Sequence, residues 1–148
     1  MPPELREQTT LVFKHFPLEN HSWARPAATL AACTADQSPT AFWELTDYLL
    51  GHQAEVRQGN IKTRAFDLLS TRREINLRQL ETCASGEAGV ALIARDEAIA
   101  KQLAIHSTPT LFINGRRVVP LESQNQLEQL LARELHSETA LVHTQAKQ

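Results

Sequence analysis

The chain has 148 residues, a length that fits one domain with a substantial buried core. Its composition, 42% hydrophobic and 22% charged, is that of an ordinary globular protein, and its net charge of −2 offers no basic surface for nucleic acid or an anionic membrane. No apolar run approaches the ~20 residues that a membrane-spanning helix needs, and the N-terminal residues lack the pattern of a secretory signal. We therefore expect neither nucleic acid nor a membrane as a partner.

The first predicted element is a strand over residues 9–16. This segment is rich in β-branched and aromatic residues, and Pro17 ends it. Several consecutive positions are apolar, which is typical of an interior strand of an α/β sheet with both faces covered.

A helical region follows over about residues 22–104. Residues that can cap a helix mark the starts of four predicted helices: Ser22, Ser38 before Pro39, Asn60, and Asn76 with Gln79 placed to complete a capping box. A fifth helix is predicted from about Gly86 to Leu103. In each of them apolar side chains recur at helical spacing.

The hydrophobic period changes after the helical region. Residues 110–113 and 116–119 flank Asn114-Gly115, the dipeptide that suits a two-residue type I′ turn because both positions need positive φ. The sequence therefore predicts a β-hairpin, with Pro120 ending its second strand.

A last helix is predicted after the hairpin. Ser123 and Gln126 form a capping box, and leucines recur at helical spacing after it, at Leu127, Leu130, Leu131 and Leu135. After about Ser137 the chain turns polar, so residues 138–148 are expected to form a polar tail.

The segment Ser107–Gly115 places Thr108-Pro109 directly before a strand that ends in Asn-Gly, and in this it resembles the cis-proline loop of DsbA-like thioredoxin domains. The resemblance extends over about residues 9–136. Other positions follow the family's order and spacing: Leu11 to Leu18, Trp23, Ala31 to Cys33, Gln37, Phe42 to Glu44, Asp47, Gln53, Cys83, Asp96 and Ala100.

This resemblance implies an α/β, thioredoxin-like fold. The sheet would be truncated, and an all-helical insertion, about residues 22–104, would lie between the first strand and the cis-proline hairpin. A single domain would cover residues 1–137.

In the family, a strand and a Cys-x-x-Cys motif precede the strand that corresponds to residues 9–16. The two cysteines of this sequence, Cys33 and Cys83, form no such motif. Thiol–disulfide exchange needs an attacking thiolate and a second thiol that resolves the mixed disulfide. The expectation is therefore a fragment of an exported protein-disulfide oxidoreductase, redox-inert as given and without catalytic residues. The resemblance suggests a periplasmic or other extracytoplasmic compartment for the parent protein.

Thr108 and Pro109 are the candidate binding residues that the resemblance implies. In the family the bond before this proline is cis, and the backbone of the preceding residue pairs with an extended substrate peptide. The implied partner is an extended peptide or an unfolded protein. A trans proline in an ordinary loop is the alternative.

Cys33 and Cys83 each lie on a predicted helix, and many family relatives carry cysteine at both positions. The resemblance implies a structural disulfide, whereas two separate buried thiols acting as small hydrophobic side chains are the alternative. If the cysteines pair, their Cα atoms should lie within about 7 Å of each other.

The histidines are scattered without the spacing of a metal site, so we expect no metal and no cofactor. Two further functions remain open: a complete, non-catalytic peptide-binding or chaperone-like module, and a relative of kappa-type glutathione transferases, which share the helical insertion. Because the family's central strand is not among these residues, the flanking strands would have open edges and the chain would self-associate.

Overall fold

The computed structural model describes the backbone of residues 2–118 and 121–145, and the surroundings of side chains as far as His136. The chain divides into two compact units. We call Lys14–His106 the helical unit, and Met1–Phe13 together with Ser107–Gln148 the hairpin unit. The elements of the helical unit are α2 (Ala24–Ala35), α3 (Pro39–Gly51), α4 (Ile61–Leu69), α5 (Leu77–Ser85) and α6 (Glu87–Gln102). Those of the hairpin unit are α1 (Pro3–Glu7), β1 (Leu111–Ile113), β2 (Arg116–Val118) and α7 (Gln124–Gln145).

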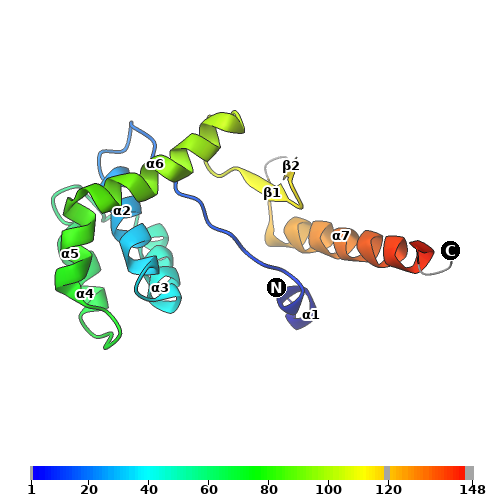
Figure 1. The fold of residues 1–148 in the computed structure, drawn as a ribbon, viewed down its shortest axis with the longest axis horizontal. Coiled ribbons are helices and arrows are strands. Elements are labelled where there is room, and N and C mark those ends of the chain that lie inside the picture. The colour runs from blue at the N-terminus through cyan, green and yellow to red at the C-terminus, as the bar shows by residue number, and fades with distance from the viewer. Residues whose placement is uncertain (1, 119–120, 146–148) are drawn as a thin grey trace. The chain divides into compact units, whose positions relative to one another are not determined.

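Helix α2 is the centre of the helical unit, in contact with α3, α4, α5 and α6 (Figure 1). Its sequence consists largely of alanine and threonine, and seven consecutive or near-consecutive positions are buried: Ala27, Thr29, Leu30, Ala31, Ala32, Cys33 and Thr34. Small side chains let neighbouring helices approach, and a helix without a polar face is stable only when it is surrounded. The unit's core forms around it, with fully buried Leu45, Ile61, Leu69 and Leu80.

Two of the predicted caps form as expected. The Ser38 hydroxyl accepts a hydrogen bond from the Ala41 N–H at the start of α3, and the Asn76 side chain accepts from Arg78 and Gln79 at the start of α5. The second bond of the predicted capping box has a different source. The backbone N–H of Asn76 donates to Oε1 of Gln37 at 2.7 Å, so a side chain from the turn after α2 takes the place that was predicted for Gln79.

Of the other two predicted helix starts, the one at Asn60 is confirmed, and the cap predicted at Ser22 is wrong. Helix α2 begins after Trp23 rather than Ser22, and no side chain caps it. Asn60 does precede α4, but its amide bonds within the preceding loop, to the Arg57 N–H and the Glu55 carbonyl, and not to the helix. An asparagine side chain can hydrogen-bond the backbone of a turn or the first amides of a helix, and the Asn60 side chain bonds the turn.

Helix α6 is followed, after its C-cap residue Leu103, by a left-handed residue, Ala104, with φ of 49°. The Ile105 N–H donates to the Ala100 carbonyl and the Ala104 N–H to the Lys101 carbonyl, the two bonds of a Schellman motif. The motif stops the helix just before the loop that contains Thr108 and Pro109.

The predicted hairpin is confirmed in the hairpin unit. β1 and β2 pair antiparallel, with Leu111 opposite Val118 and Ile113 opposite Arg116. The turn residues Asn114 and Gly115 have φ of 47° and 77°, the two positive values that a type I′ turn requires. Val119 and Pro120, the predicted end of the second strand, lie outside the described residues.

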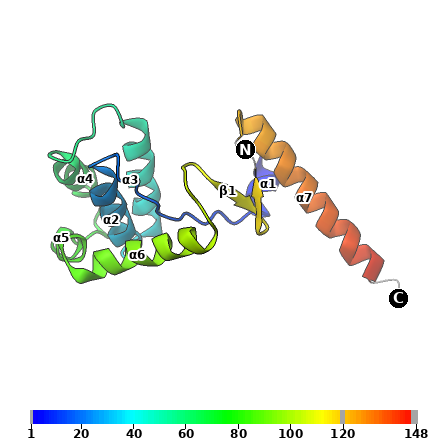
Figure 2. The ribbon, with the colours of Figure 1, turned by 90° about the horizontal axis from the view of Figure 1, so that it is seen from above.

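Helix α7 follows, and its predicted capping box forms in altered form. The Gln126 N–H donates to the Ser123 hydroxyl, but the Gln126 side chain accepts from the N–H of Glu122. The helix packs against α1 (Figure 2). It continues to Gln145, beyond the end predicted near Ser137.

The strand predicted over residues 9–16 is wrong. This segment adopts no strand in the structure, and Leu11 and Val12 are 66% and 68% exposed. A strand is stable only when its backbone groups pair with a neighbouring strand. The sheet that the described residues form contains β1 and β2 alone, so this β-prone sequence lacks the partner that would make it a strand.

Candidate functional site

The loop before β1 holds the predicted binding residues in an accessible position. The Thr108–Pro109 peptide bond is cis, the form that the resemblance implied, and both residues are exposed. A hydrogen bond joins the two ends of the loop: the Thr110 hydroxyl donates to the Ser107 carbonyl at 2.6 Å. Thr108 is therefore exposed in the loop that leads into β1.

β1 offers one edge to a further strand. Its other edge pairs with β2, and among the described residues no strand lies beyond β1. The side chains of Leu111, Phe112 and Ile113 are half-buried, and the Arg117 guanidinium lies 5.4 Å from the centre of the Phe112 ring across the hairpin. An extended segment could therefore pair with backbone groups along residues 108–113.

The two cysteines meet in the helical unit. Cys33 of α2 and Cys83 of α5 form a disulfide, with their Cα atoms 6.0 Å apart. Neither is a free thiol. The bond joins the central helix to a peripheral one and closes a loop between residues 50 positions apart.

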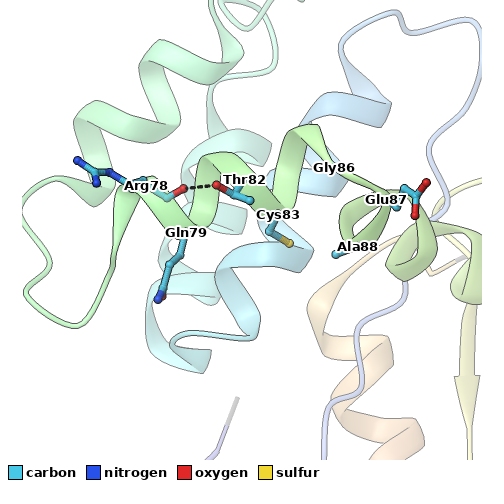
Figure 3. A pocket seen from close by; sticks show the side chains of 7 residues that line it. All are labelled: Arg78, Gln79, Thr82, Cys83, Gly86, Glu87 and Ala88. Atoms are coloured by element: carbon cyan, nitrogen blue, oxygen red, sulfur yellow. Dashed lines mark hydrogen bonds between the residues drawn. The ribbon is translucent and has the colours of Figure 1, made fainter.

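A shallow hollow open to solvent lies at the bend between α5 and α6, and Figure 3 shows the residues around it. Its lining consists of Arg78, Gln79, Thr82 and Cys83 from α5 and of Gly86, Glu87 and Ala88 at the start of α6. One of the two disulfide cysteines therefore borders solvent, a feature that the spacing of the cysteines in the sequence could not reveal.

A second feature that sequence reasoning missed is the surroundings of Asp96. This aspartate of α6 is buried, and its carboxylate accepts hydrogen bonds from the Lys14 ammonium and from the backbone N–H of His15, both at 2.9 Å. The partners lie more than 80 residues apart in sequence. The signal that could have found this site is an aspartate at an inward position of an amphipathic helix, because a buried carboxylate needs donors.

His15 lies in the same place, edge-on to the Phe42 ring with the ring centres 6.1 Å apart. Burial lowers the pKa of His15 from its usual 6.5, and the Asp96 carboxylate opposes this effect only in part. The neutral imidazole is therefore the favoured form in this packing.

Within the described part of the chain, no three histidine, cysteine, aspartate or glutamate side chains gather closely enough to hold a metal ion. Across the same residues, no helix has both the length and the apolar character that crossing a bilayer requires.

The comparisons with known proteins give one family-model match and two curated relatives that carry a different description. The family model described as thioredoxin matches residues 7–133. Among curated proteins, the Na(+)/H(+) antiporter NhaA 3 of Salinispora tropica is 36% identical over 107 residues, which are 72% of this chain and 15% of that protein. The Na(+)/H(+) antiporter NhaA 1 of Salinispora arenicola is 34% identical over 122 residues, 78% of this chain and 18% of that protein.

The chain therefore spans less than a fifth of the length of the curated relatives it matches. No solved structure gives a significant match.

Proposed function

This chain belongs to the thioredoxin family, and we propose that it is a DsbA-like domain that binds an extended peptide or unfolded protein at the Thr108–Pro109 loop, as the substrate-binding part of a thiol–disulfide oxidoreductase. Its fold is thioredoxin-like, mostly helical with a small two-stranded sheet, so the predicted fold class is confirmed.

One observation carries the proposal: the exposed Thr108–Pro109 loop runs directly into β1. An extended peptide that adds to a sheet edge gains backbone hydrogen bonds whatever its sequence. The half-buried side chains of β1 add apolar contact. Together these features suit a partner that is recognised as an unfolded chain rather than as a particular sequence.

The exchange reaction needs more than this loop. A thiolate must attack a disulfide of the substrate, and a second thiol must resolve the intermediate. The two cysteines of the sequence are already joined to each other, so in this state they supply neither group. The reacting pair of the proposed oxidoreductase would have to come from residues outside those printed. The Cys33–Cys83 disulfide supports an extracytoplasmic location as part of this proposal.

A second candidate is a non-catalytic peptide-binding or chaperone-like module. The observation that favours it is the same joined pair, which leaves no free thiol in the sequence. Both candidates share peptide binding at Thr108. They differ in whether the peptide then undergoes thiol chemistry.

The test of the shared step is a titration of the isotopically labelled chain with an unfolded, apolar peptide, followed by amide NMR. We expect the amides of Thr108 and of alternate residues of β1 to shift. Those of β2 should change less, because β2 lies on the far side of β1 from the open edge. Peptide-dependent shifts confined to the helical unit, or no shifts at all, would contradict the proposal.

The same charged substitution at two positions tests the site. Thr108→Glu should weaken peptide binding, whereas the control Thr63→Glu, at an exposed position of α4, should leave it unchanged.

An insulin-reduction assay then separates the two candidates. Measured on a protein that also contains a Cys-x-x-Cys segment upstream of residue 1, turnover supports the oxidoreductase, and its absence supports the binding module.

A further inference from the structure

The two sulfur atoms of the disulfide differ in how a solvent molecule can reach them. Cys33 is 1% exposed, in the last turn of α2, the helix that the other helices of the unit surround. Cys83 is half-buried near the end of α5 and lines the hollow between α5 and α6 (Figure 3). Attack on a disulfide requires access to one sulfur, opposite the sulfur that leaves. In the folded protein, Cys83 is the one of the two residues that borders solvent.

The charges at this hollow favour the approach of an anionic small molecule. The Arg78 side chain lines it, and helix α6 begins there at Gly86, where no side chain caps the first amides. The uncapped start of a helix of this length carries partial positive charge. The lining also includes one carboxylate, Glu87, which offsets part of this charge. Positive surroundings of this kind favour the thiolate over the thiol, and the thiolate is the form that attacks.

We propose that Cys83 is a thiol-modification site at which a small thiol, of the glutathione class, attacks the Cys33–Cys83 disulfide of the folded protein. The thiolate of the small molecule forms a bond to Sγ of Cys83, and the Cys33–Cys83 bond breaks. The electron pair of that bond leaves with Cys33, which becomes a thiolate and takes a proton from water. The products are a mixed disulfide on Cys83 and a thiol on Cys33, so atoms and electrons balance.

The reaction reverses through the same sulfur. The Cys33 thiolate attacks Sγ of Cys83 and expels the small thiol, which restores the original disulfide. The site therefore responds to the surrounding thiol concentration without exposing Cys33. This inference does not depend on peptide binding at Thr108, which lies in the other unit.

The experiment treats the folded, oxidised chain with reduced glutathione, quenches with acid and alkylates the freed thiols in acidic denaturant so that Cys33 cannot reverse the exchange. Digestion with trypsin and mass spectrometry then locate the glutathionyl group. Cys83 falls in the fragment 79–95 and Cys33 in the fragment 15–57, because the Arg25–Pro26 bond resists trypsin. We expect the mixed disulfide on 79–95 in about tenfold or greater excess, since exchange follows access to sulfur. In concentrated urea, where both sulfurs are exposed, the excess should disappear.

Equal labelling of the two fragments under native conditions, or labelling only in urea, would overturn the proposal. The Arg78→Ala variant tests the approach to the sulfur separately. It should slow the reaction with anionic glutathione by about two- to fivefold and leave the reaction with cationic cysteamine unchanged or faster. An equal effect on the rates of both thiols would show that the charge of Arg78 does not attract the attacking thiolate.

Discussion

The backbone of Gly89 passes so close to Cys83 that a Cβ atom on Gly89 would lie 2.5 Å from the Cys83 carbonyl oxygen. The same atom would lie 2.6 Å from the Thr29 methyl group. α2, α5 and α6 meet at this point, and glycine is the residue that allows them to do so.

The Gly89→Ala variant should therefore be destabilised, although alanine is the better helix former. The obstacle is backbone, so the helices must move apart, and overpacking of this kind costs about 1–3 kcal/mol of the free energy of unfolding. Chemical denaturation measures it. Gly51→Ala is the control: no atom lies within 4 Å of the added carbon, and stability should stay the same or rise. An unchanged free energy of unfolding for Gly89→Ala would mean that the close approach of the helices is not required.

The features that the sequence predicted correctly are those that a few neighbouring residues determine. The Asn114-Gly115 turn, the Ser38 cap and the two bonds to the Asn76 side chain are of this kind. Each depends on side chains within three or four positions, so a single stretch of sequence contains the whole cause.

The features that it missed depend on a distant partner. Gln37 caps Asn76 from 39 residues away, and Asp96 receives donors from Lys14 and His15. The segment 9–16 has the composition of a strand, but a strand also needs a neighbour, which its own sequence does not provide. Thr108 and Pro109 are candidate binding residues through family resemblance alone, because no local rule marks an exposed proline loop as a binding site.

The disulfide should contribute substantially to the stability of the helical unit. On the chain-entropy model, a cross-link between residues 50 positions apart restricts the unfolded chain by about 4 kcal/mol, and measured gains are often smaller. The double variant Cys33→Ala/Cys83→Ala should therefore melt at a lower temperature than the oxidised protein. Adding a reductant should lower the melting temperature of the parent protein and leave that of the double variant unchanged. Equal melting temperatures for the two proteins would show that the cross-link is dispensable.

Asp96→Ala should destabilise the helical unit more than the loss of an ordinary surface charge. It leaves the His15 N–H and the Lys14 ammonium without their acceptor, at about 1–3 kcal/mol of the free energy of unfolding. Glu97→Ala is the matched control on the same helix. Its ion pair with Arg25 is exposed, and such pairs contribute about 0–1 kcal/mol. Similar losses for the two variants, measured by denaturation, would contradict the structural role of Asp96.

The half-buried imidazole of His15 predicts a stability that falls in mild acid. Its pKa in the folded protein lies below the usual 6.5, so between these two values the unfolded chain binds more protons than the folded one. The contribution of neutral His15 to the free energy of unfolding is thus fully present above about pH 6.5, and it is lost as the pH falls toward the folded-state pKa. His15→Gln should reduce this decline, followed as melting temperature against pH, whereas His106→Gln, at an exposed position, should retain it. An unchanged profile for His15→Gln would assign the decline to other groups.

The last prediction concerns the hairpin unit, in which no described side chain is fully buried. Its sheet has an open edge along β1, and the β-prone segment at Leu11 and Val12 is exposed. Unpaired strand edges and exposed apolar segments join with those of other molecules, so we expect the chain to self-associate as its concentration rises. Light scattering coupled to size-exclusion chromatography measures this.

The substitution that tests the source of the association is Leu11→Lys/Val12→Lys, because charge on such a segment opposes strand pairing. It should shift the protein toward monomer. Leu50→Lys is the control: Leu50 is 56% exposed on α3, outside the hairpin unit, and its replacement should leave the association unchanged. A protein that stays monodisperse and monomeric at every concentration would show that the hairpin unit needs no further strand. Association that only Leu50→Lys abolishes would place the interface on the helical unit.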